Sequence, residues 1–535
     1  MNPVPRYHQA SKHSLDRFAP GPGYMDWESQ PEPFRWYDGT AVHPLPVEPS
    51  GEDPPFAALL KPGAIPPQPL NLESLSRLFL YSFGLAAWKE YMGERWALRC
   101  HPSSGNLHPI ESFLIAPSPL FAGVHHYLSR DHVLESRWRP GANHDWDTAF
   151  PPGTLLIGLS LIHRRETWKY GLRAYRYGQL NLGHAAATLS YSAAILGWQV
   201  TLRADGSDDD LAVLSGLAQS PSQDEEHPGL WLEVNTRSHP ASPGIDLARL
   251  AKLVTTGSWL GRPNSLGSSP PMPWPGVEEA TRTFRKTSGG WTAEPAFVAL
   301  PDLIPAPMQR PAGALIRGRR SAQRYDGRTI LSLQAFCRIL DRLLPRPGLP
   351  PWGVAPPTPC IHPVLLVHRV EVIPPGLYLL PRSSAVLPAL QAALPSTPAW
   401  RTLTAIPDHL HLLLLREGDF REIATLISCR QEIAADGAFT LGMLADFQAN
   451  PAEDPWNYRA LHWEAGMLGQ VLYLAAGEEG MQGTGIGCFF DDLFHQWLEL
   501  EGQRFQTVYH FTVGQALNDR RLMTHHPYAH LRQRG

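Results

Sequence analysis

The chain carries the segment Pro102-Ser103-Ser104-Gly105-Asn106-Leu107-His108-Pro109 and, later, a poorer copy of it, Pro356-Pro357-Thr358-Pro359-Cys360-Ile361-His362-Pro363. The second copy keeps the first proline and the His-Pro pair, but it loses the asparagine and both serines. A repeated pattern whose copies differ in their polar groups indicates two related halves. We therefore expect that only one of two sites related by the repeat is complete.

Two further matches follow in the same order along the chain. The segment Arg319-Arg320-Ser321-Ala322-Gln323-Arg324-Tyr325-Asp326-Gly327 matches residues 30–39 when both are aligned on Tyr-Asp-Gly, and here the second copy keeps the charged groups. Tyr175-Arg176 precedes Gly183 as Tyr458-Arg459 precedes Gly466. The stretch from Tyr-Asp-Gly to His-Pro is much shorter in the second half. Either that half has lost a segment, or the alignment on Tyr-Asp-Gly is out of register.

Composition limits the class of protein. A chain of 535 residues is too long for one core, and 43% hydrophobic content with 10% aromatic residues is typical of globular domains. A net charge of −4 argues against nucleic acid as a partner. No apolar run is long enough for a signal peptide or a membrane span, so we expect a cytoplasmic protein without a membrane partner. Five scattered cysteines form no CxxC pair and are expected to be free thiols.

The pattern along the chain predicts four parts. Residues 1–70 form a Pro-rich N-terminal arm, 71–240 a first domain, 241–310 a linker rich in Pro, Gly and Ser, and 311–535 a second domain. Mixed helices and strands in both halves predict α+β domains with a central sheet covered by helices. Helices are expected from residue 71, with Asn71 as the cap, and at 183–196, 247–254 and 333–344. Strands are expected at 111–116, 124–128, 155–161, 230–234, 364–373, 377–380, 410–415 and 507–513.

Three segments carry groups suited to binding a ligand. The arginines and serine of residues 319–324 are typical of a phosphate site, or of a solvated turn that enters a helix. Residues 102–106 form a tight turn whose side chains can face a heteroaromatic edge, although such a turn also occurs without a ligand. The spaced glycines of residues 483–489 let backbone N–H groups approach a ligand closely, but they lack the spacing of a dinucleotide fingerprint.

Together the three segments resemble the FMN-dependent nitroreductase superfamily. The resemblance implies two nitroreductase-like domains, each with a central mixed or antiparallel sheet, fused as an internal pseudo-dimer with FMN between the halves. Segments of both halves would then complete a single site. The residues implied to bind FMN are Pro102, Ser103, Ser104, Asn106, Arg319, Ser321, Gln323, Gly485, Ile486, Gly487, Arg520 and Arg521.

The segment from Trp168 to Tyr177 is similar to the azoline-oxidising SagB-type dehydrogenases. This branch implies that Lys169 and Tyr170 are catalytic, because oxidising a C–H bond next to nitrogen requires a base and a hydride acceptor. Without the resemblance, a surface lysine and a packing tyrosine would be the favoured explanation of the pair. The second half has Trp456-Asn457-Tyr458 in the corresponding place, and therefore no second base.

We expect an FMN-dependent oxidoreductase that dehydrogenates a C–N substrate, such as an azoline-containing peptide or a related small molecule, by hydride transfer to flavin N5. One alternative is an NAD(P)H-dependent nitro or quinone reductase. The other is a non-catalytic scaffold for a peptide-modifying partner. Expected partners are the small-molecule or modified-peptide substrate and biosynthetic partner enzymes. The histidines lack metal-ligand spacing, so no metal is expected.

Overall fold

Two sheets in one chain form the framework of the protein. The computed structural model describes residues 3–48, 50–141, 145–219, 224–237, 244–268, 272–288, 290–291, 299–306, 309–395, 400–449 and 454–532. Within these residues each large sheet has seven strands, in the orders β2-β7-β6-β5-β8-β10-β9 and β14-β15-β13-β12-β16-β18-β17. The neighbouring strands pair antiparallel. The order β5-β8-β10-β9 corresponds to β12-β16-β18-β17, which confirms the predicted pair of related α+β halves.

The first sheet consists of β2 (Val42–Pro44), β5 (Ile110–Ala116), β6 (Gly123–Leu128), β7 (Val133–Trp138), β8 (Thr154–Ile162), β9 (Gln199–Leu202) and β10 (Glu226–Asn235). The second consists of β12 (Ile361–Val367), β13 (Gly376–Leu379), β14 (Arg401–Thr402), β15 (Leu413–Glu417), β16 (Phe439–Asp446), β17 (Gln482–Ile486) and β18 (Phe505–Gly514). The shorter strands are β1 (Tyr37–Asp38), β3 (Leu85–Tyr91), β4 (Glu94–Arg99), β11 (Arg262–Pro263) and β19 (Met523–His525).

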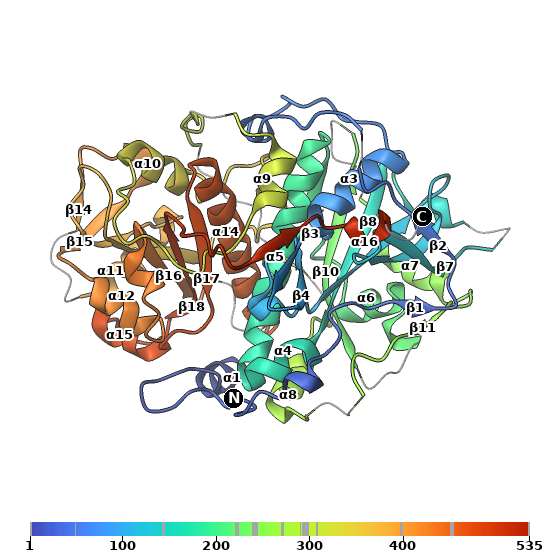
Figure 1. The fold of residues 1–535 in the computed structure, drawn as a ribbon, viewed down its shortest axis with the longest axis horizontal. Helices are drawn as coiled ribbons and strands as arrows, with labels where there is room; N and C mark the ends of the chain where they lie inside the picture. Colours follow the sequence, from blue (N-terminus) through green and yellow to red (C-terminus); the bar gives the residue numbers. More distant parts are fainter. Residues whose placement is uncertain are drawn as a thin grey trace.

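Helices cover the sheets and fill the space between them (Figure 1). Those of the first half and the arm are α1 (Pro3–Ala10), α2 (Phe56–Leu59), α3 (Leu72–Ser82), α4 (His163–Tyr170), α5 (Ala174–Ile195), α6 (Asp208–Leu214), α7 (Leu247–Val254) and α8 (Pro275–Thr283). Those of the second half are α9 (Ala312–Gly318), α10 (Leu333–Asp341), α11 (Leu387–Ala393), α12 (Arg421–Ile427), α13 (Ile433–Asp436), α14 (Asn457–Glu478), α15 (Asp491–Leu498) and α16 (Ala529–Arg532). The predicted cap of α3 is present, since the Asn71 side chain accepts a hydrogen bond from Ser74 N at 2.9 Å.

The two halves meet where α5 and α14 cross, side by side at the centre of the molecule (Figure 1). A Cβ atom on Gly183 would collide with the Trp463 carbonyl oxygen, and one on Gly466 with the Leu180 carbonyl oxygen. Only glycine lets two helix backbones approach this closely. The Tyr-Arg and glycine match therefore marks equivalent positions, and these positions lie on the pseudo-symmetry axis.

The Tyr-Asp-Gly match, by contrast, was wrong as an alignment of the halves. Tyr37 belongs to β1, which pairs with β11, whereas the Tyr325 hydroxyl donates to carbonyl oxygens of β17 and β18. The segments that face each other are those before α2 and α9, joined by an antiparallel bridge between Pro55 and Pro311. Gly39 and Gly327 both have positive φ, so the shared letters specify the same local turn at different places.

The ends of the chain are exchanged between the halves. Near the C-terminus, β19 pairs with β3 of the first half, and Leu85 N donates to the buried Tyr528 hydroxyl at 2.9 Å. Near the N-terminus, Lys12 Nζ donates to Asp492 Oδ1 of the second half at 2.6 Å. The arm also supplies β2 at the edge of the first sheet. The boundaries at residues 70, 240 and 310 stay a prediction. In the described part of the chain, no helix combines the length and apolarity that crossing a membrane requires.

Candidate active site

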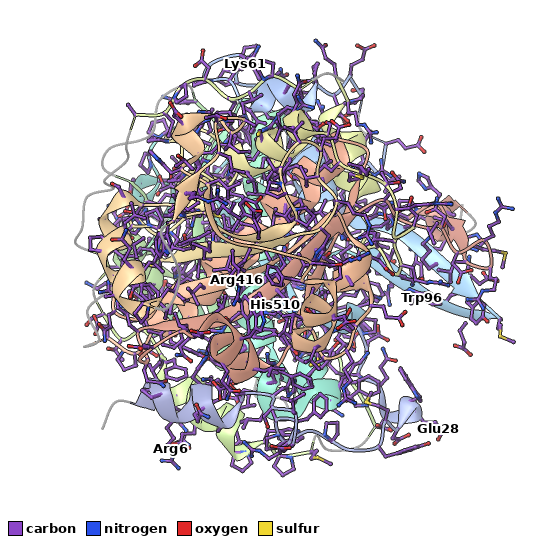
Figure 2. All side chains as sticks on the ribbon, turned by 90° about the vertical axis from the view of Figure 1, so that its left-hand side faces the viewer. Arg6, Glu28, Lys61, Trp96, Arg416 and His510 are labelled. Carbon is purple, nitrogen blue, oxygen red and sulfur yellow. The ribbon has the colours of Figure 1, made fainter. Side chains whose placement is uncertain are left out.

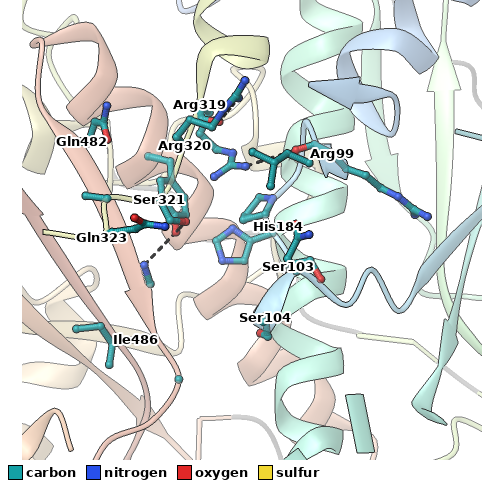
Figure 3. A pocket seen from close by; sticks show the side chains of 18 of the residues that line it. Arg99, Ser103, Ser104, His184, Arg319, Arg320, Ser321, Gln323, Gln482 and Ile486 are labelled. Carbon is teal, nitrogen blue, oxygen red and sulfur yellow. Dashed lines mark hydrogen bonds between the residues drawn. The ribbon is translucent and has the colours of Figure 1, made fainter. Parts of the chain in front are cut away.

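A cavity of about 760 Å³ lies between the two halves (Figure 3). Segments more than two hundred residues apart in the sequence form its walls. They are the hairpin β3–β4, the turn at 102–106, α4 and α5 from the first half, and residues 319–323, α14, β17 and the loop after it from the second. In Figure 3, Ser103 and Ser104 face the cavity opposite Arg319, Ser321 and Gln323, with His184 between them.

The turn at residues 102–106 is held in place by its own polar groups. Ser103 Oγ accepts a hydrogen bond from His108 N at 2.8 Å, and Asn106 Nδ2 donates to Ala97 O at 2.8 Å. Gly105 and Asn106 have φ of 58° and 59°, which is the left-handed region that glycine and asparagine adopt most readily. The asparagine amide group therefore fixes the shape of the turn by bonding to the backbone of β4.

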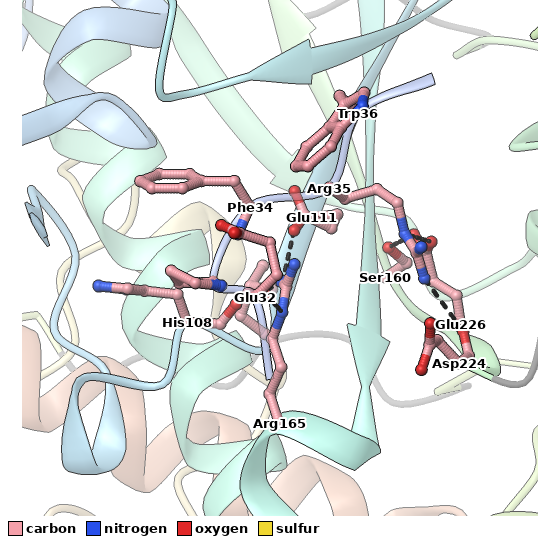
Figure 4. Close-up of polar contacts among 12 residues, drawn as sticks. Glu32, Phe34, Arg35, Trp36, His108, Glu111, Ser160, Arg165, Asp224 and Glu226 are labelled. Atoms are coloured by element: carbon pink, nitrogen blue, oxygen red, sulfur yellow. Dashed lines mark hydrogen bonds and ion pairs between the residues drawn. The ribbon is translucent and has the colours of Figure 1, made fainter. Parts of the chain in front are cut away.

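Buried charges support this turn from behind (Figure 4). Arg165 Nη1 donates to His108 O at 2.7 Å and to Glu111 Oε1 at 2.5 Å, and its Nε donates to Glu32 O at 2.9 Å. Burial opposes ionisation of Glu111, but Arg165 and Arg99 outweigh it and hold the pKa of this carboxyl well below its usual range. The network ties the arm, the turn and α4 together, so it sets the position of one cavity wall.

Three basic side chains line the cavity without an acidic partner. Arg319 is 9% exposed, and its guanidinium donates to Cys100 O at 3.0 Å and lies 5.0 Å from the ring centroid of Tyr473. Arg320 donates to the carbonyl oxygens of Arg317 and Arg319, and Lys89 Nζ donates to Thr524 Oγ1. Among the described residues, none of the three forms an ion pair with a carboxylate. Burial lowers the pKa of Arg319.

The glycines of β17 and the following loop let tyrosine side chains pack directly against the backbone. A Cβ on Gly485 would collide with the Tyr509 hydroxyl, and one on Gly487 would lie 2.6 Å from the Tyr177 ring. The Tyr473 hydroxyl links the walls, because it accepts a hydrogen bond from Gly485 N at 3.0 Å and lies 2.7 Å from Ser321 Oγ. Both glycines therefore present backbone, without a side chain, to the cavity.

The predicted site residues are not all brought together. The cavity is lined by Tyr170 and by the predicted cofactor residues Pro102, Ser103, Ser104, Asn106, Arg319, Ser321, Gln323, Gly485, Ile486 and Gly487. Lys169 is half-buried, lies outside the lining, and holds its Nζ 5.5 Å from the centroid of the Tyr170 ring. Arg520 and Arg521 are exposed and also lie outside it. Arg521 instead pairs with Asp519 at 2.6 Å. The cavity is lined instead by Arg320 and Lys89.

Several lining residues were missed by the sequence reasoning. Tyr177, Asn181 and His184 lie on one face of α5, at a helical spacing that could have revealed them. Lys89 and Trp96 come from the β3–β4 hairpin, which projects from the body with Trp96 on it (Figure 2). Two buried nitrogens of histidines in the cavity lining, His101 Nε2 and His184 Nδ1, have no hydrogen-bond partner in the described structure.

The buried carboxyl of Glu166 is linked to the cavity wall by hydrogen bonds of Asn181. Asn181 Nδ2 donates to Glu166 Oε1 at 2.7 Å, while Asn181 Oδ1 accepts a hydrogen bond from Ser104 N at 3.1 Å. Burial raises the pKa of Glu166 well above its usual value, so this carboxyl keeps its proton to a higher pH in the folded state than in the unfolded state. The neutral Glu166 carboxyl favours the folded state, and this contribution to stability is fully present below the pKa of Glu166 in the unfolded chain. It is lost as the pH rises through the pKa of Glu166 in the folded protein.

We therefore expect Glu166→Gln to be stable over a wider pH range than the wild type. Glutamine stays neutral and still accepts from Asn181, so the urea midpoint of the variant should exceed that of the wild type increasingly as the pH rises from 5 to 8. Urea unfolding followed by tryptophan fluorescence at each pH measures this difference. Glu28→Gln, at an exposed carboxyl, is the control. If the urea midpoints of the variant and the wild type differ by the same amount from pH 5 to 8, Glu166 does not have a raised pKa in the folded protein.

The corresponding place in the second half lacks the serines and the asparagine of the first turn. Glu464 occupies the position on α14 that Asn181 occupies on α5, counted from the two crossing glycines. Its Oε2 accepts a hydrogen bond from Cys360 N at 2.9 Å, two residues beyond the one that aligns with Ser104. Its Oε1 pairs with Arg382, and both side chains are 1% exposed. A buried ion pair therefore lies beside the second turn, and a cavity of about 530 Å³ remains along α5 and β9.

No family model matches the sequence, and no curated relative matches it either. Among solved structures, one described as a candidate nitroreductase from Anabaena variabilis matches 97% of this chain and 100% of its own length, with 21% identity and a TM-score of 0.67. Another described in the same way, from Ralstonia eutropha, matches 42% of this chain and 98% of its own, with 19% identity and a TM-score of 0.28. The E. coli microcin synthetase McbBCD complex, solved with truncated pro-MccB17 bound, matches 36% of this chain and 69% of its own, with 20% identity and a TM-score of 0.25. The full-length match shows the fold.

Proposed function

We propose that this chain, which has the fold of the nitroreductase from Anabaena variabilis over nearly its whole length, is an FMN-dependent oxidoreductase with one flavin site. The observation that carries the proposal is the set of three basic side chains in the cavity without a carboxylate partner. Buried cations are normally paired, so the buried Arg319, together with the partly exposed Arg320 and Lys89 beside it, favours an anionic ligand such as a phosphate group.

The rest of the cavity fits FMN. Its volume lies within the range of about 300 to 1,000 Å³ that is usual for small-molecule and cofactor sites. Gly485 and Gly487 line the cavity without side chains, which suits the close approach of a planar ring. Ser103, Ser104 and Asn181 offer hydrogen bonds on the opposite side. Bound FMN would supply a hydride acceptor at its N5 atom.

The residues have separate roles in this proposal. Arg319, Ser321 and Arg320 hold the phosphate and the chain that joins it to the ring. The turn at 102–106 and the Gly485–Gly487 loop position the ring, and Tyr170 forms the floor beside Gly105, against which its hydroxyl packs. Arg520 and Arg521, predicted to bind phosphate, would need to move to reach the cavity. The second turn lacks both serines and the asparagine, which predicts a single FMN.

The first experiment is a visible spectrum of the purified protein, followed by release of the chromophore and its ratio to protein. We expect a yellow protein with about one FMN per chain, since only one of the two related sites carries the serines, the asparagine and the arginines. A ratio of about two would overturn the assignment of a single FMN site. A colourless protein that takes up no added FMN would favour a scaffold for a peptide-modifying partner.

For the reaction, we propose dehydrogenation of a C–N substrate such as an azoline-containing peptide, with biosynthetic enzymes as partners. Lys169 removes the proton and Tyr170, in the cavity wall, relays it. The pair lies at the end of α4, where Lys169 Nζ approaches the Tyr170 ring. Because the lysine lies outside the lining, it must turn towards the substrate to act.

The variant Lys169→Ala is expected to retain FMN and to lose turnover by about a hundredfold or more, as is usual for removal of a general base. Lys252→Ala, a lysine at the end of α7 in the first half, is the matched control. Single-turnover bleaching of the flavin by substrate measures the rate at which the substrate is oxidised. A normal rate would remove Lys169 from the mechanism. Rapid bleaching by NAD(P)H under anaerobic conditions would favour the nitro or quinone reductase instead.

A further inference from the structure

Two cysteines that are far apart in the sequence meet beside the cavity. Cys488 lines the cavity directly after β17, and Cys429 follows α12. Two hydrogen bonds join their segments: Phe490 N donates to Ile427 O at 2.8 Å, and Gln431 Nε2 donates to Cys488 O at 3.1 Å. Both cysteines are free and partly exposed. The backbone therefore holds the two thiols side by side at a place that small molecules can reach.

The segment of Cys429 has an unusual backbone. Cys429 and the next residue, Arg430, have φ of 54° and 60°, so two consecutive residues that are not glycine adopt the left-handed conformation. Each such residue costs on the order of 1 kcal/mol or more and persists only where its surroundings enforce it, often at functional sites. The hydrogen bonds of Phe490 and Gln431 provide that enforcement, and the conformation brings Cys429 to Cys488.

The surroundings shift the pKa values of the two thiols in opposite directions. A hydrogen bond from the Cys429 thiol, together with His13, holds the pKa of Cys488 well below its usual range, although burial opposes the shift. The same hydrogen bond raises the pKa of Cys429. The nearby Arg173, which donates to Gly487 O at 3.0 Å, adds positive charge beside Cys488. One thiolate beside one thiol is the arrangement that forms a disulfide most readily.

We propose that Cys429 and Cys488 are a redox-active pair that exchanges two electrons with the bound flavin by forming and breaking a disulfide. The Cys488 thiolate and the Cys429 thiol join in an S–S bond. The two electrons and the thiol proton pass to the oxidised flavin as a hydride equivalent, and the reverse step reduces the disulfide. This step rests on the proposed FMN site as the electron acceptor. The pair itself rests on the geometry of the two segments alone.

The first test uses the full-length protein with FMN bound, treated with diamide and then alkylated with iodoacetamide. Proteolysis without reduction, followed by mass spectrometry, should reveal a peptide that links Cys429 to Cys488. Cys100, Cys337 and Cys360, which are buried, should remain thiols in the same sample. Cys429→Ser and Cys488→Ser should each abolish the link, whereas the control Cys337→Ala should retain it.

The second test counts electrons, independently of turnover. After diamide is removed, the oxidised protein is titrated anaerobically with dithionite while flavin absorbance is followed. The wild type and Cys337→Ala should take up about two two-electron equivalents per flavin, and both serine variants about one.

Each result decides between the two proposals. If FMN is bound but Cys429 and Cys488 stay fully alkylatable after diamide, the cysteine proposal fails and the flavin site stands. A linked peptide with uptake of only one equivalent overturns electron exchange with the flavin. A linked peptide in a protein that binds no FMN overturns the proposed function, and electron exchange with it, and leaves a disulfide without a flavin partner.

Discussion

Arg319→Ala is expected to weaken FMN binding by about tenfold to a hundredfold. A hydrogen bond to a charged group contributes about 1.5 to 3 kcal/mol, and each 1.4 kcal/mol corresponds to tenfold in affinity. Arg319 is buried in the cavity wall without a carboxylate partner among the described residues, so an anionic ligand gains the full benefit of its charge. Fluorescence titration of protein freed of flavin, with FMN and in parallel with riboflavin, measures the effect.

Riboflavin, which lacks the phosphate, separates binding from folding. Arg319 also donates hydrogen bonds to backbone carbonyl oxygens of Arg99 and Cys100, so its loss could disturb the wall itself. A specific loss of phosphate binding lowers the affinity for FMN and leaves that for riboflavin nearly unchanged. Arg324→Ala, in the same segment but exposed and outside the cavity, should affect neither ligand. Equal losses for both ligands would show that Arg319 supports the fold and does not bind phosphate.

The second large effect concerns the crossing of α5 and α14. We expect Gly466→Val to lower the free energy of unfolding by about 3 kcal/mol or more, at the upper end of what overpacking costs. The added side chain would collide with the carbonyl oxygen and carbon of Leu180, which are backbone atoms and cannot rotate away. The helices must therefore separate, and the cavity between the halves must change with them. Urea unfolding and the FMN content of the variant are the two measurements.

Gly477→Ala on the same helix is the matched control. Its Cβ would lie 2.9 Å from Leu315 Cδ1, the end of a side chain that can move, and alanine is a better helix former than glycine by about 1 kcal/mol. This variant should be as stable as the wild type or more so. If Gly466→Val unfolds at the same urea concentration as Gly477→Ala, the close crossing of the two helices is incorrect.

Most regular elements could be predicted from local pattern. The helix α7 has the predicted bounds, and α3 starts after its predicted cap, because apolar spacing and a capping side chain are local signals. The hairpin β3–β4 was missed because its turn is Met92-Gly93. Both residues have positive φ, as in the tight turns that usually carry Asn-Gly or Asp-Gly, and a methionine at the first position hides the signal. With the hairpin, Lys89 was missed as well.

The residues of the candidate site likewise divide into those that local sequence reveals and those that it does not. The turn at 102–106 and the arginines at 319–320 could be found because polar groups crowd into a few consecutive residues. Tyr473 and Tyr509 could not be found, since single aromatic residues in buried helices and strands look like core. They become part of the cavity only because α14 and β18 pack against the first half.

The sequence by itself determined that the chain is duplicated, that its copies are unequally equipped, and which short segments carry the polar groups. Tertiary structure alone decided that the first half's turn faces the second half's arginines, that Glu464 and Arg382 form an ion pair beside the other turn, and that Cys429 meets Cys488. The physical reason is the distance along the sequence over which each kind of interaction acts. Turns, caps and periodicity depend on neighbours a few residues away, whereas these meetings depend on helix crossing and strand pairing between distant segments, whose register is set by packing across the whole molecule.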